Sequence, residues 1–329
     1  MFDSVLVSGL ITILVGVGGM FAYFWASNYV LDTYIYPATG ENIGRNINRA
    51  NMIRPWLFLF PAIFALGLYL VVPVFYSAWL SVTSGVAADG GWFRNYQEIF
   101  GNETFRVSLL NNLLWVLVVP AASTFFGLLA AQLTDKLSWG NIAKSLIFMP
   151  MAISFVGASL IWSFVYHPEI EIGVINAVRG FFGAEDGVTL IDGQVIDSFL
   201  LMVVLIWIQT GFAMVILSAA LRGVPEETIE AAILDGASPM QVFFRIKVPQ
   251  IMGTIVVVWT TITILVLKVY DIVAAMGSQY RNLEILPTQM MQYFDSGNYG
   301  FATAIAVVIM ILVLPVMIWN IRQARAEMR

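Results

Sequence analysis

The sequence predicts an all-α membrane protein with about seven transmembrane helices. The chain has 329 residues, of which 59% are hydrophobic and only 11% are charged. A soluble domain of this length and composition would expose apolar surface that nothing covers. A spanning helix needs about 20 mainly apolar residues. The segments that meet this requirement are 5–26, 55–80, 108–134, 146–167, 198–220, 251–275 and 301–321.

Lys and Arg residues predict how these segments are oriented, because they are enriched in cytoplasmic loops. If the polar stretch 224–249 is cytoplasmic, eleven of the sixteen basic residues fall on that side. The N-terminus is then expected outside and the C-terminus in the cytoplasm. The first segment follows Met1-Phe2-Asp3, which lacks the basic start of a signal peptide, and its apolar run is long. We therefore interpret it as a retained helix.

Composition argues against several kinds of chemistry. The chain has no cysteine and a single histidine, His167, so no metal site is expected. Its net charge of -5 argues against nucleic acid as a partner. Residues 139–145 contain Lys144-Ser145 but lack the glycine and spacing of a Walker A motif. An intramembrane protease would need paired catalytic residues within the bilayer, and no pair of aspartates lies in a predicted span. We expect a protein that is not an enzyme and has no cofactor in this chain.

The longest charged stretch between two apolar segments is 224–249, with the sequence VPEETIEAAILDGASPMQVFFRIKVP. Pro225 followed by two glutamates suits the first turn of a helix. Gly236 can take the left-handed conformation that ends a helix. Ser238 can cap a second helix, which Pro249 closes. The stretch therefore predicts two short helices joined at a bend, lying along the membrane surface.

Within this stretch, the letters EAA are followed after three residues by Gly, and after nine more by Ile-x-Val-Pro. This spacing resembles the EAA loop of membrane permeases in binding-protein-dependent ABC importers, where the last motif is Ile-x-Leu-Pro. The one departure is Val248, a conservative change. The residues that carry the resemblance are Glu230, Ala231, Ala232, Asp235, Gly236, Ile246 and Pro249.

The resemblance implies a type I ABC importer permease fold in the bacterial inner membrane. Residues 55–329 would form a six-helix core with the EAA loop, and residues 1–54 an additional helix and a cytoplasmic connector. The implied partners are a second homologous permease, membrane lipid, an extracytoplasmic solute-binding protein and two ATPase subunits. Those subunits would bind ATP and Mg²⁺, and each would accept one EAA helix. A pore acting alone is the alternative, but such a pore has no use for this loop.

The segment after residue 269 is similar to the end of carbohydrate-type permeases. The similarity rests on Tyr270-Asp271, on Thr288 through Tyr293, and on Tyr299 through Ala304. The family often has Gly-Gly-Pro where this chain has Gly-Ser-Gln at 277–279. The resemblance implies an α-glucoside or oligosaccharide as the substrate. A polyol, glycerol-phosphate or another small solute is the alternative.

Polar residues inside spans are costly, so they are candidates for substrate contact. In maltose-type permeases the part of the chain that resembles segment 198–220 borders the substrate. Gln209 and Phe212 can share one helical face. Trp207, Thr210 and Thr263 are the further candidates. The alternative is that the threonines bond to carbonyls of their own helix and that Trp207 packs or faces lipid.

Three connecting features complete the expectations. Alternating residues around Asp192-Gly193 predict a small β-hairpin over 188–196. The connector 28–54 could form a short interfacial helix. The prolines inside spans are either hinges for alternating access or static kinks; they are Pro61, Pro73, Pro120 and Pro315.

Overall fold

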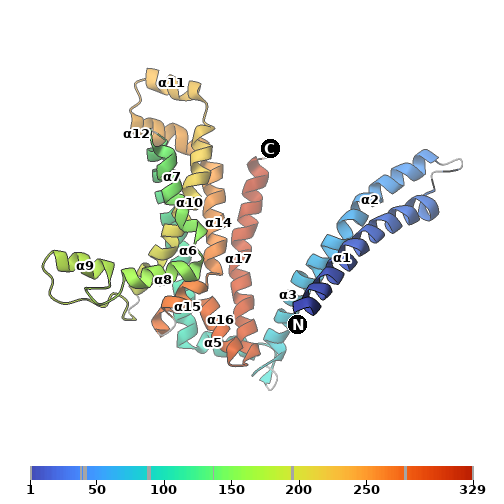
Figure 1. Ribbon diagram of the computed structural model, residues 1–329, viewed down its shortest axis with the longest axis horizontal. Helices are drawn as coiled ribbons and strands as arrows, with labels where there is room; N and C mark the ends of the chain where they lie inside the picture. The colour runs from blue at the N-terminus through green and yellow to red at the C-terminus, as the bar shows by residue number, and fades with distance from the viewer. Residues whose placement is uncertain are drawn as a thin grey trace. The chain divides into compact units, whose positions relative to one another are not determined.

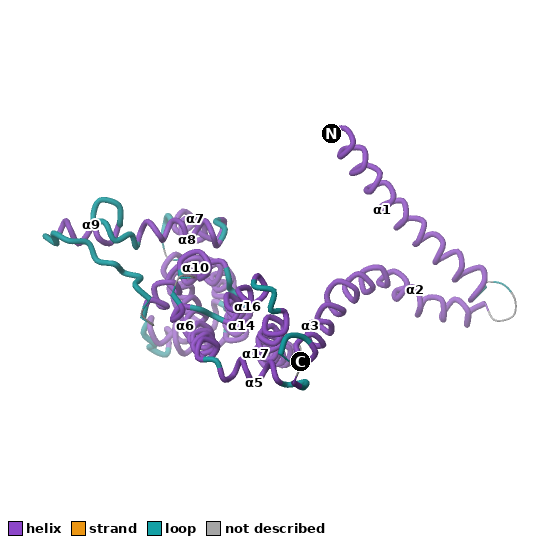
Figure 2. Tube along the Cα trace, turned by 90° about the horizontal axis from the view of Figure 1, so that it is seen from below, coloured by secondary structure: helices purple, strands orange, loops and turns teal. Residues whose placement is uncertain are grey.

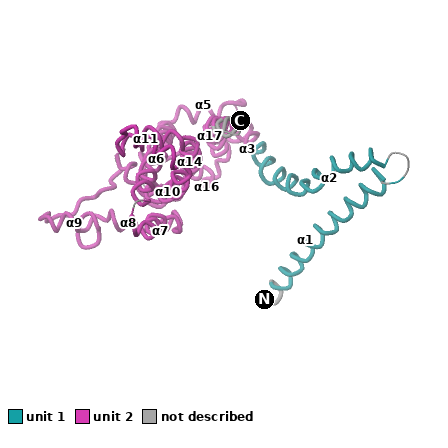
Figure 3. The backbone as a smooth tube through the Cα atoms, turned by 90° about the horizontal axis from the view of Figure 1, so that it is seen from above, with its two compact units in different colours: residues 1–76 teal, residues 77–329 magenta. Residues whose placement is uncertain are grey.

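A computed structural model describes residues 2–37, 39, 43–86, 90–135, 137–193, 196–277 and 280–327. Within these ranges the regular structure is helical and no strand occurs, which confirms the all-α class (Figure 2). Residues 1–76 and 77–329 form separate compact units (Figure 3). The division of function at residue 54 stays a prediction.

The described chain contains five helical stretches that are long and apolar enough to cross a membrane. They are Leu6–Ile35, Ile43–Thr83, Glu103–Thr134, Asp197–Arg222 and Tyr299–Trp319. Two bent helix pairs raise the number to seven, as predicted: Gly140–Ala152 with Phe155–Val165, at 105°, and Pro239–Gln250 with Met252–Leu267, at 70°. Two of the predicted segments, 146–167 and 251–275, were wrong as single continuous helices.

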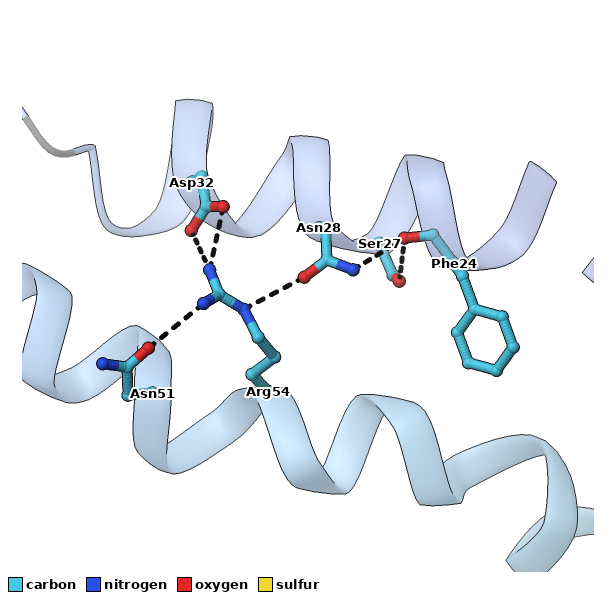
Figure 4. Close-up of polar contacts among 6 residues, drawn as sticks. All are labelled: Phe24, Ser27, Asn28, Asp32, Asn51 and Arg54. Atoms are coloured by element: carbon cyan, nitrogen blue, oxygen red, sulfur yellow. Dashed lines mark hydrogen bonds and ion pairs between the residues drawn. The ribbon is translucent and has the colours of Figure 1, made fainter. Parts of the chain in front are cut away.

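The N-terminal unit is a helical hairpin built from α1 (Phe2–Val30) and α2 (Ile43–Leu66). Arg54 of α2 holds the pair together (Figure 4). Its Nη2 donates to both carboxylate oxygens of Asp32, at 2.7 and 2.9 Å, and its Nε donates to Asn28 Oδ1 at 3.0 Å. Such charge-assisted bonds are stronger than neutral ones. In the described part of 28–54, the helix from α1 continues through η1 (Leu31–Ile35), and α2 starts at Ile43 and runs to Leu66, so the short separate interfacial helix that this connector could form is wrong.

Three π turns interrupt the described helices, and each ends two residues before a proline. They are Leu31–Ile35 (η1), Gly67–Val71 (η2) and Val242–Lys247 (η4), followed by Pro37, Pro73 and Pro249. In each case the residue before the proline donates its N–H to the carbonyl five residues back: Tyr36 to Leu31, Val72 to Gly67 and Val248 to Phe243.

The physical cause is the proline ring. It has no N–H and it displaces the carbonyl four residues before it, which lies inside the π turn. The wider turn gives the preceding N–H a partner one residue further back. Pro61, Pro120 and Pro315 lie instead inside α-helices. Whether any of the prolines acts as a hinge stays open.

The core of the second unit is organised around α10 (Asp197–Arg222), which packs along α6 (Glu103–Thr134) and contacts α7 (Gly140–Phe148), α8 (Phe155–Val165) and α14 (Met252–Leu267). Figure 1 shows α6, α10, α14 and α17 (Tyr299–Glu327) running side by side. The inward side chains of α10 are large and aliphatic, and Leu201, Leu205 and Leu217 are fully buried. In a membrane, such side chains hold helices together mainly through close van der Waals contact.

Two glycines bring α10 close to its neighbours. A Cβ on Gly127 of α6 would lie 2.4 Å from Ala213 Cβ and 2.9 Å from Met214 N, both on α10. A Cβ on Gly211 of α10 would lie 2.6 Å from Ile147 O of α7. Small residues at helix crossings let backbones approach in membrane proteins. The α6–α10–α7 arrangement therefore requires glycine at both crossings.

Short elements also connect the long helices: α5 (Arg94–Gly101), α9 (Val174–Phe181), α15 (Asp271–Met276) and α16 (Leu286–Asp295). Two neighbouring side chains of α6 fix the connector before α16. Asn111 Nδ2 donates to Asn282 O at 2.7 Å and to Glu284 O at 2.9 Å. Asn112 Oδ1 accepts from Leu286 N at 2.9 Å. Backbone groups of the segment 282–286 are thus satisfied by side chains of a spanning helix.

The β-hairpin expected over 188–196 is wrong, because the described residues 188–193 and 196 form no strand. Side chains take the place of a ladder. Asn176 Nδ2 donates to Val188 O at 2.9 Å, and Asn176 Oδ1 accepts from Val188 N at 3.0 Å. Asp197 Oδ2 accepts from the N–H groups of Asp192 and Gly193, both at 2.9 Å. The backbone groups that a hairpin would pair are bonded to α9 and α10 instead.

The glycine crossing gives a direct test. Gly127→Ala should destabilise the folded chain by about 1–3 kcal/mol, because the new methyl group meets α10 backbone that cannot move away cheaply. Thermal unfolding in detergent measures the effect. Gly44→Ala is the matched control, since no atom lies within 4 Å of its added Cβ. Equal melting temperatures for the two variants would contradict the close crossing.

Candidate functional site

The EAA loop, residues 224–249, lies at one end of the core. It starts where α10 ends at Arg222 and continues through α11 (Glu226–Leu234), α12 (Pro239–Gln241), η4 and α13 (Val248–Gln250). Figure 1 shows α11 and α12 beyond the ends of α7, α10 and α14. The helical stretch that starts at Pro239 ends at Gln250, where a 70° bend leads into α14.

The two predicted helices of the loop and their bend are confirmed, but the second helix continues past Pro249 and ends at Gln250. Gly236 has φ +83°, the left-handed conformation that ends α11. Beyond it, Ala237 N donates to Ala232 O at 3.0 Å. Ser238 and Gln241 form a capping box, in which Gln241 Oε1 accepts from Ser238 N at 2.7 Å and Ser238 Oγ accepts from Gln241 N. The local sequence therefore determines this part of the structure.

The outward face of the loop exposes both charge and apolar surface. Glu230 and Ala231 are exposed, and Ala232 is half-buried. Leu234 of α11 is 88% exposed. The other exposed apolar side chains of the loop are Ile233, Met240 and Phe244. Exposed apolar side chains rimmed by polar residues are typical of a protein–protein or membrane contact.

The remaining residues of the EAA resemblance lie beside this face. Asp235, Gly236 and half-buried Ile246 line one small pocket together with Gln241 and Arg245. Pro249 is exposed in α13, just before the bend. The structure thus brings Asp235, Gly236 and Ile246 together and places Pro249 further along the chain.

The inward face of the loop covers a polar pocket of about 700 Å³. Glu226 and Ile229 of α11 line it on one side, and the ends of α6 and α7 line it on the other. Lys144 of α7 donates to Asp135 Oδ1 at the end of α6, and to Ser218 Oγ of α10 at 2.7 Å. Ser218 Oγ in turn donates to Asp135 Oδ1 at 3.1 Å.

This three-residue cluster is absent from the predictions made from sequence. One signal could have found it: Asp135 directly follows an apolar span, where the negative end of a helix disfavours a carboxylate. A carboxylate at this position is stabilised by a nearby cation. Lys144 lies between the same two predicted spans, 108–134 and 146–167, as Asp135 does.

The candidate substrate residues have different surroundings. Thr210 Oγ1 donates to Ile206 O at 2.7 Å, and Thr263 Oγ1 donates to Trp259 O at 2.8 Å. Each threonine thus bonds to its own helix, the alternative stated above. Trp207 packs edge-on against Trp162, with ring centroids 5.8 Å apart.

Gln209 is buried in α10 and Phe212 is half-buried one turn later. Their role in substrate contact stays a prediction. In the described part of the chain, no group of three or more His, Cys, Asp or Glu residues is placed to hold a metal ion.

An all-helical core of candidate membrane spans with a helix–Gly–helix loop at one end is the arrangement expected of the importer permeases that the EAA loop resembles. Comparison with known families identifies the chain further. Residues 123–325 match the family described as binding-protein-dependent transport system inner membrane component. The chain belongs to this family and is a multi-pass inner-membrane permease subunit rather than an enzyme.

Individual relatives and solved structures agree with this assignment. The chain is 54% identical to the alpha-glucoside transport system permease protein AglF of Rhizobium meliloti, over 98% of each chain. It is 42% identical to the osmoprotective compounds uptake permease protein GgtC of Synechocystis, over 82% of this chain and 99% of that one. The fold matches a bacterial ABC transporter involved in alginate import, with a TM-score of 0.72, 19% identity, and coverage of 88% of this chain and all of that one.

Proposed function

We propose that this chain forms, with a second homologous permease, the membrane path of an importer for an α-glucoside or α-linked oligosaccharide. The observation that carries the proposal is the 54% identity to an alpha-glucoside permease over almost the full length of both chains. A second candidate is import of a non-sugar small solute such as a polyol. The identity of 42% to a permease for osmoprotective compounds favours that alternative.

Energy would come from two ATPase subunits that bind ATP and Mg²⁺. The EAA loop supplies the contact: α11 presents Glu230 and Ala231 outward, and small side chains let a partner groove approach the backbone closely. The exposed apolar side chains beside them, Leu234 above all, would be buried in that groove. An extracytoplasmic solute-binding protein would deliver the substrate to the opposite end.

The substrate assignment is tested with the complete complex in lipid. The complex is assembled from this chain and the subunits encoded beside it. ATPase activity is measured with the cognate binding protein and a panel of α-glucosides, β-glucosides, polyols and glycerol-phosphate. Stimulation by an α-glucoside alone is expected. Stimulation by a polyol and by no sugar would transfer the assignment to the second candidate.

The docking role of α11 is tested by Glu230→Lys. Reversing a charge at the centre of a contact should reduce ATPase co-purification at least about tenfold. The new lysine would either face a like charge on the partner or be buried without an opposite charge. Pull-down from solubilised membranes measures the effect. Glu185→Lys reverses an equally exposed glutamate in a different connecting segment and should leave co-purification unchanged. Normal assembly and transport by Glu230→Lys would rule out the contact.

The substrate contact of Gln209 is tested by Gln209→Ala. Loss of one buried hydrogen bond of about 1–1.5 kcal/mol should raise the KM for transport about tenfold. Thr210→Val is the neighbouring control, because its hydroxyl is already bonded to Ile206 O and should matter less. The measurement is uptake into proteoliposomes over a range of substrate concentrations. A larger effect for Thr210→Val than for Gln209→Ala would reverse the assignment.

A further inference from the structure

The Asp135–Lys144–Ser218 cluster joins three helices at the end of the core that carries the EAA loop. Asp135 caps the end of α6, Lys144 lies in α7, and Ser218 lies one turn before the end of α10. Ser218 is 1% exposed, and the side chains of Lys144 and Asp135 are 16% and 24% exposed. The cluster is therefore buried at Ser218 and open to water on its Asp135 side, where both charged residues line the pocket.

The position of the cluster distinguishes it from an ordinary interhelical contact. Ser218 precedes Arg222, the last residue of α10, and α11 begins four residues later at Glu226. Asp135 and Lys144 line the pocket whose opposite side is formed by Glu226 and Ile229 of α11. The cluster is thus the polar link between the helix that enters the EAA loop and the two helices beside it.

The same three helices are also packed closely against one another further from the loop. α10 already contacts α6 backbone at Gly127 and α7 backbone at Gly211. These close crossings fix the helices away from the loop, whereas the cluster fixes their ends beside the loop. Close-packed helices that are held together at two positions along their length move as one body, because packed interfaces do not deform continuously.

We propose that the Asp135–Lys144–Ser218 cluster is a clasp that makes α6 and α7 move with the EAA loop when the ATPase subunits change state. The clasp is a positioning element: it touches neither substrate nor nucleotide. It acts by transmitting movement of α11 through α10 into the membrane core. The proposal rests on the proposed function, since it takes the EAA loop as the ATPase contact.

The distance between α7 and α11 tests the clasp without reference to any substrate. The chain has no cysteine, so single labels can be introduced cleanly at exposed positions. Spin labels at Ser145→Cys in α7 and Thr228→Cys in α11 report the distance in nucleotide-free and ATP-trapped complexes. With the clasp intact, the distance should be the same in both states. In Lys144→Ala, it should change by about 5 Å, the scale of one helical turn.

Transport measurements separate positioning from simple destabilisation. Lys144→Ala should still assemble with the ATPase and retain basal hydrolysis, while the amount of solute transported per ATP falls at least about fivefold. The exchanged pair Asp135→Lys with Lys144→Asp should recover part of the loss. Ser163→Ala is the control for Ser218→Ala, because Ser163 Oγ bonds only to its own helix, at Ser159 O.

Each outcome either supports or overturns the role of the cluster as a clasp. An α7–α11 distance that changes equally with and without the clasp would overturn the proposal, and so would full coupling in both Lys144→Ala and Ser218→Ala. If Lys144→Ala does not assemble, Ser218→Ala and the exchanged pair give the same test, because both keep opposite charges at positions 135 and 144. Failure of every sugar to stimulate the native complex would refute the proposed substrate but leave the distance measurement intact.

Discussion

The close packing of α10 against α6 and α7 is the constraint on which the rest of the core depends. Glycine at 127 and 211 lets backbone meet backbone at both crossings. In a membrane, apolar side chains gain little by leaving lipid for one another, so close van der Waals contact must hold helices together. The consequence is mechanical as well as energetic. The helix that enters the EAA loop is also the most deeply buried helix of the core.

Both ends of this packed core are completed by polar side chains. At one end Asn111 and Asn112 hold the connector before α16, and at the other Lys144 joins three helix ends. Each set satisfies groups that would be costly to bury alone. Packing in the middle gives the core its cohesion, while these bonds determine how the helices connect to the elements outside the membrane.

Local sequence predicted the EAA loop well, because its structure is determined within the segment. Gly236 supplies a left-handed residue, and Ser238 with Gln241 completes a capping box. The number of spans was also predictable, since it depends on apolar length alone. The sharp bends at 153–154 and at Ile251 were not, because hydropathy measures length and cannot detect a change of direction. The hairpin around Asp192-Gly193 failed because side chains outside the segment, Asn176 and Asp197, bond the backbone that a ladder would use.

The π turns show what a closer interpretation of the sequence could have added. Each described π turn ends two residues before a proline, so Pro37, Pro73 and Pro249 mark positions where helical hydrogen bonding shifts by one residue. Pro61, Pro120 and Pro315 do not produce such a turn, so proline alone is not sufficient.

In the EAA loop the π turn lies between α12 and α13, directly before the bend into α14. A segment that is already wound more loosely than an α-helix can absorb rotation at lower cost. α11 is therefore connected to the membrane core in two different ways: through α10, which is bonded to its neighbours by the clasp, and through η4, whose hydrogen bonds reach five residues back instead of four. A force applied to α11 should travel mainly through α10, because the stiffer of two parallel connections carries the larger share of the force.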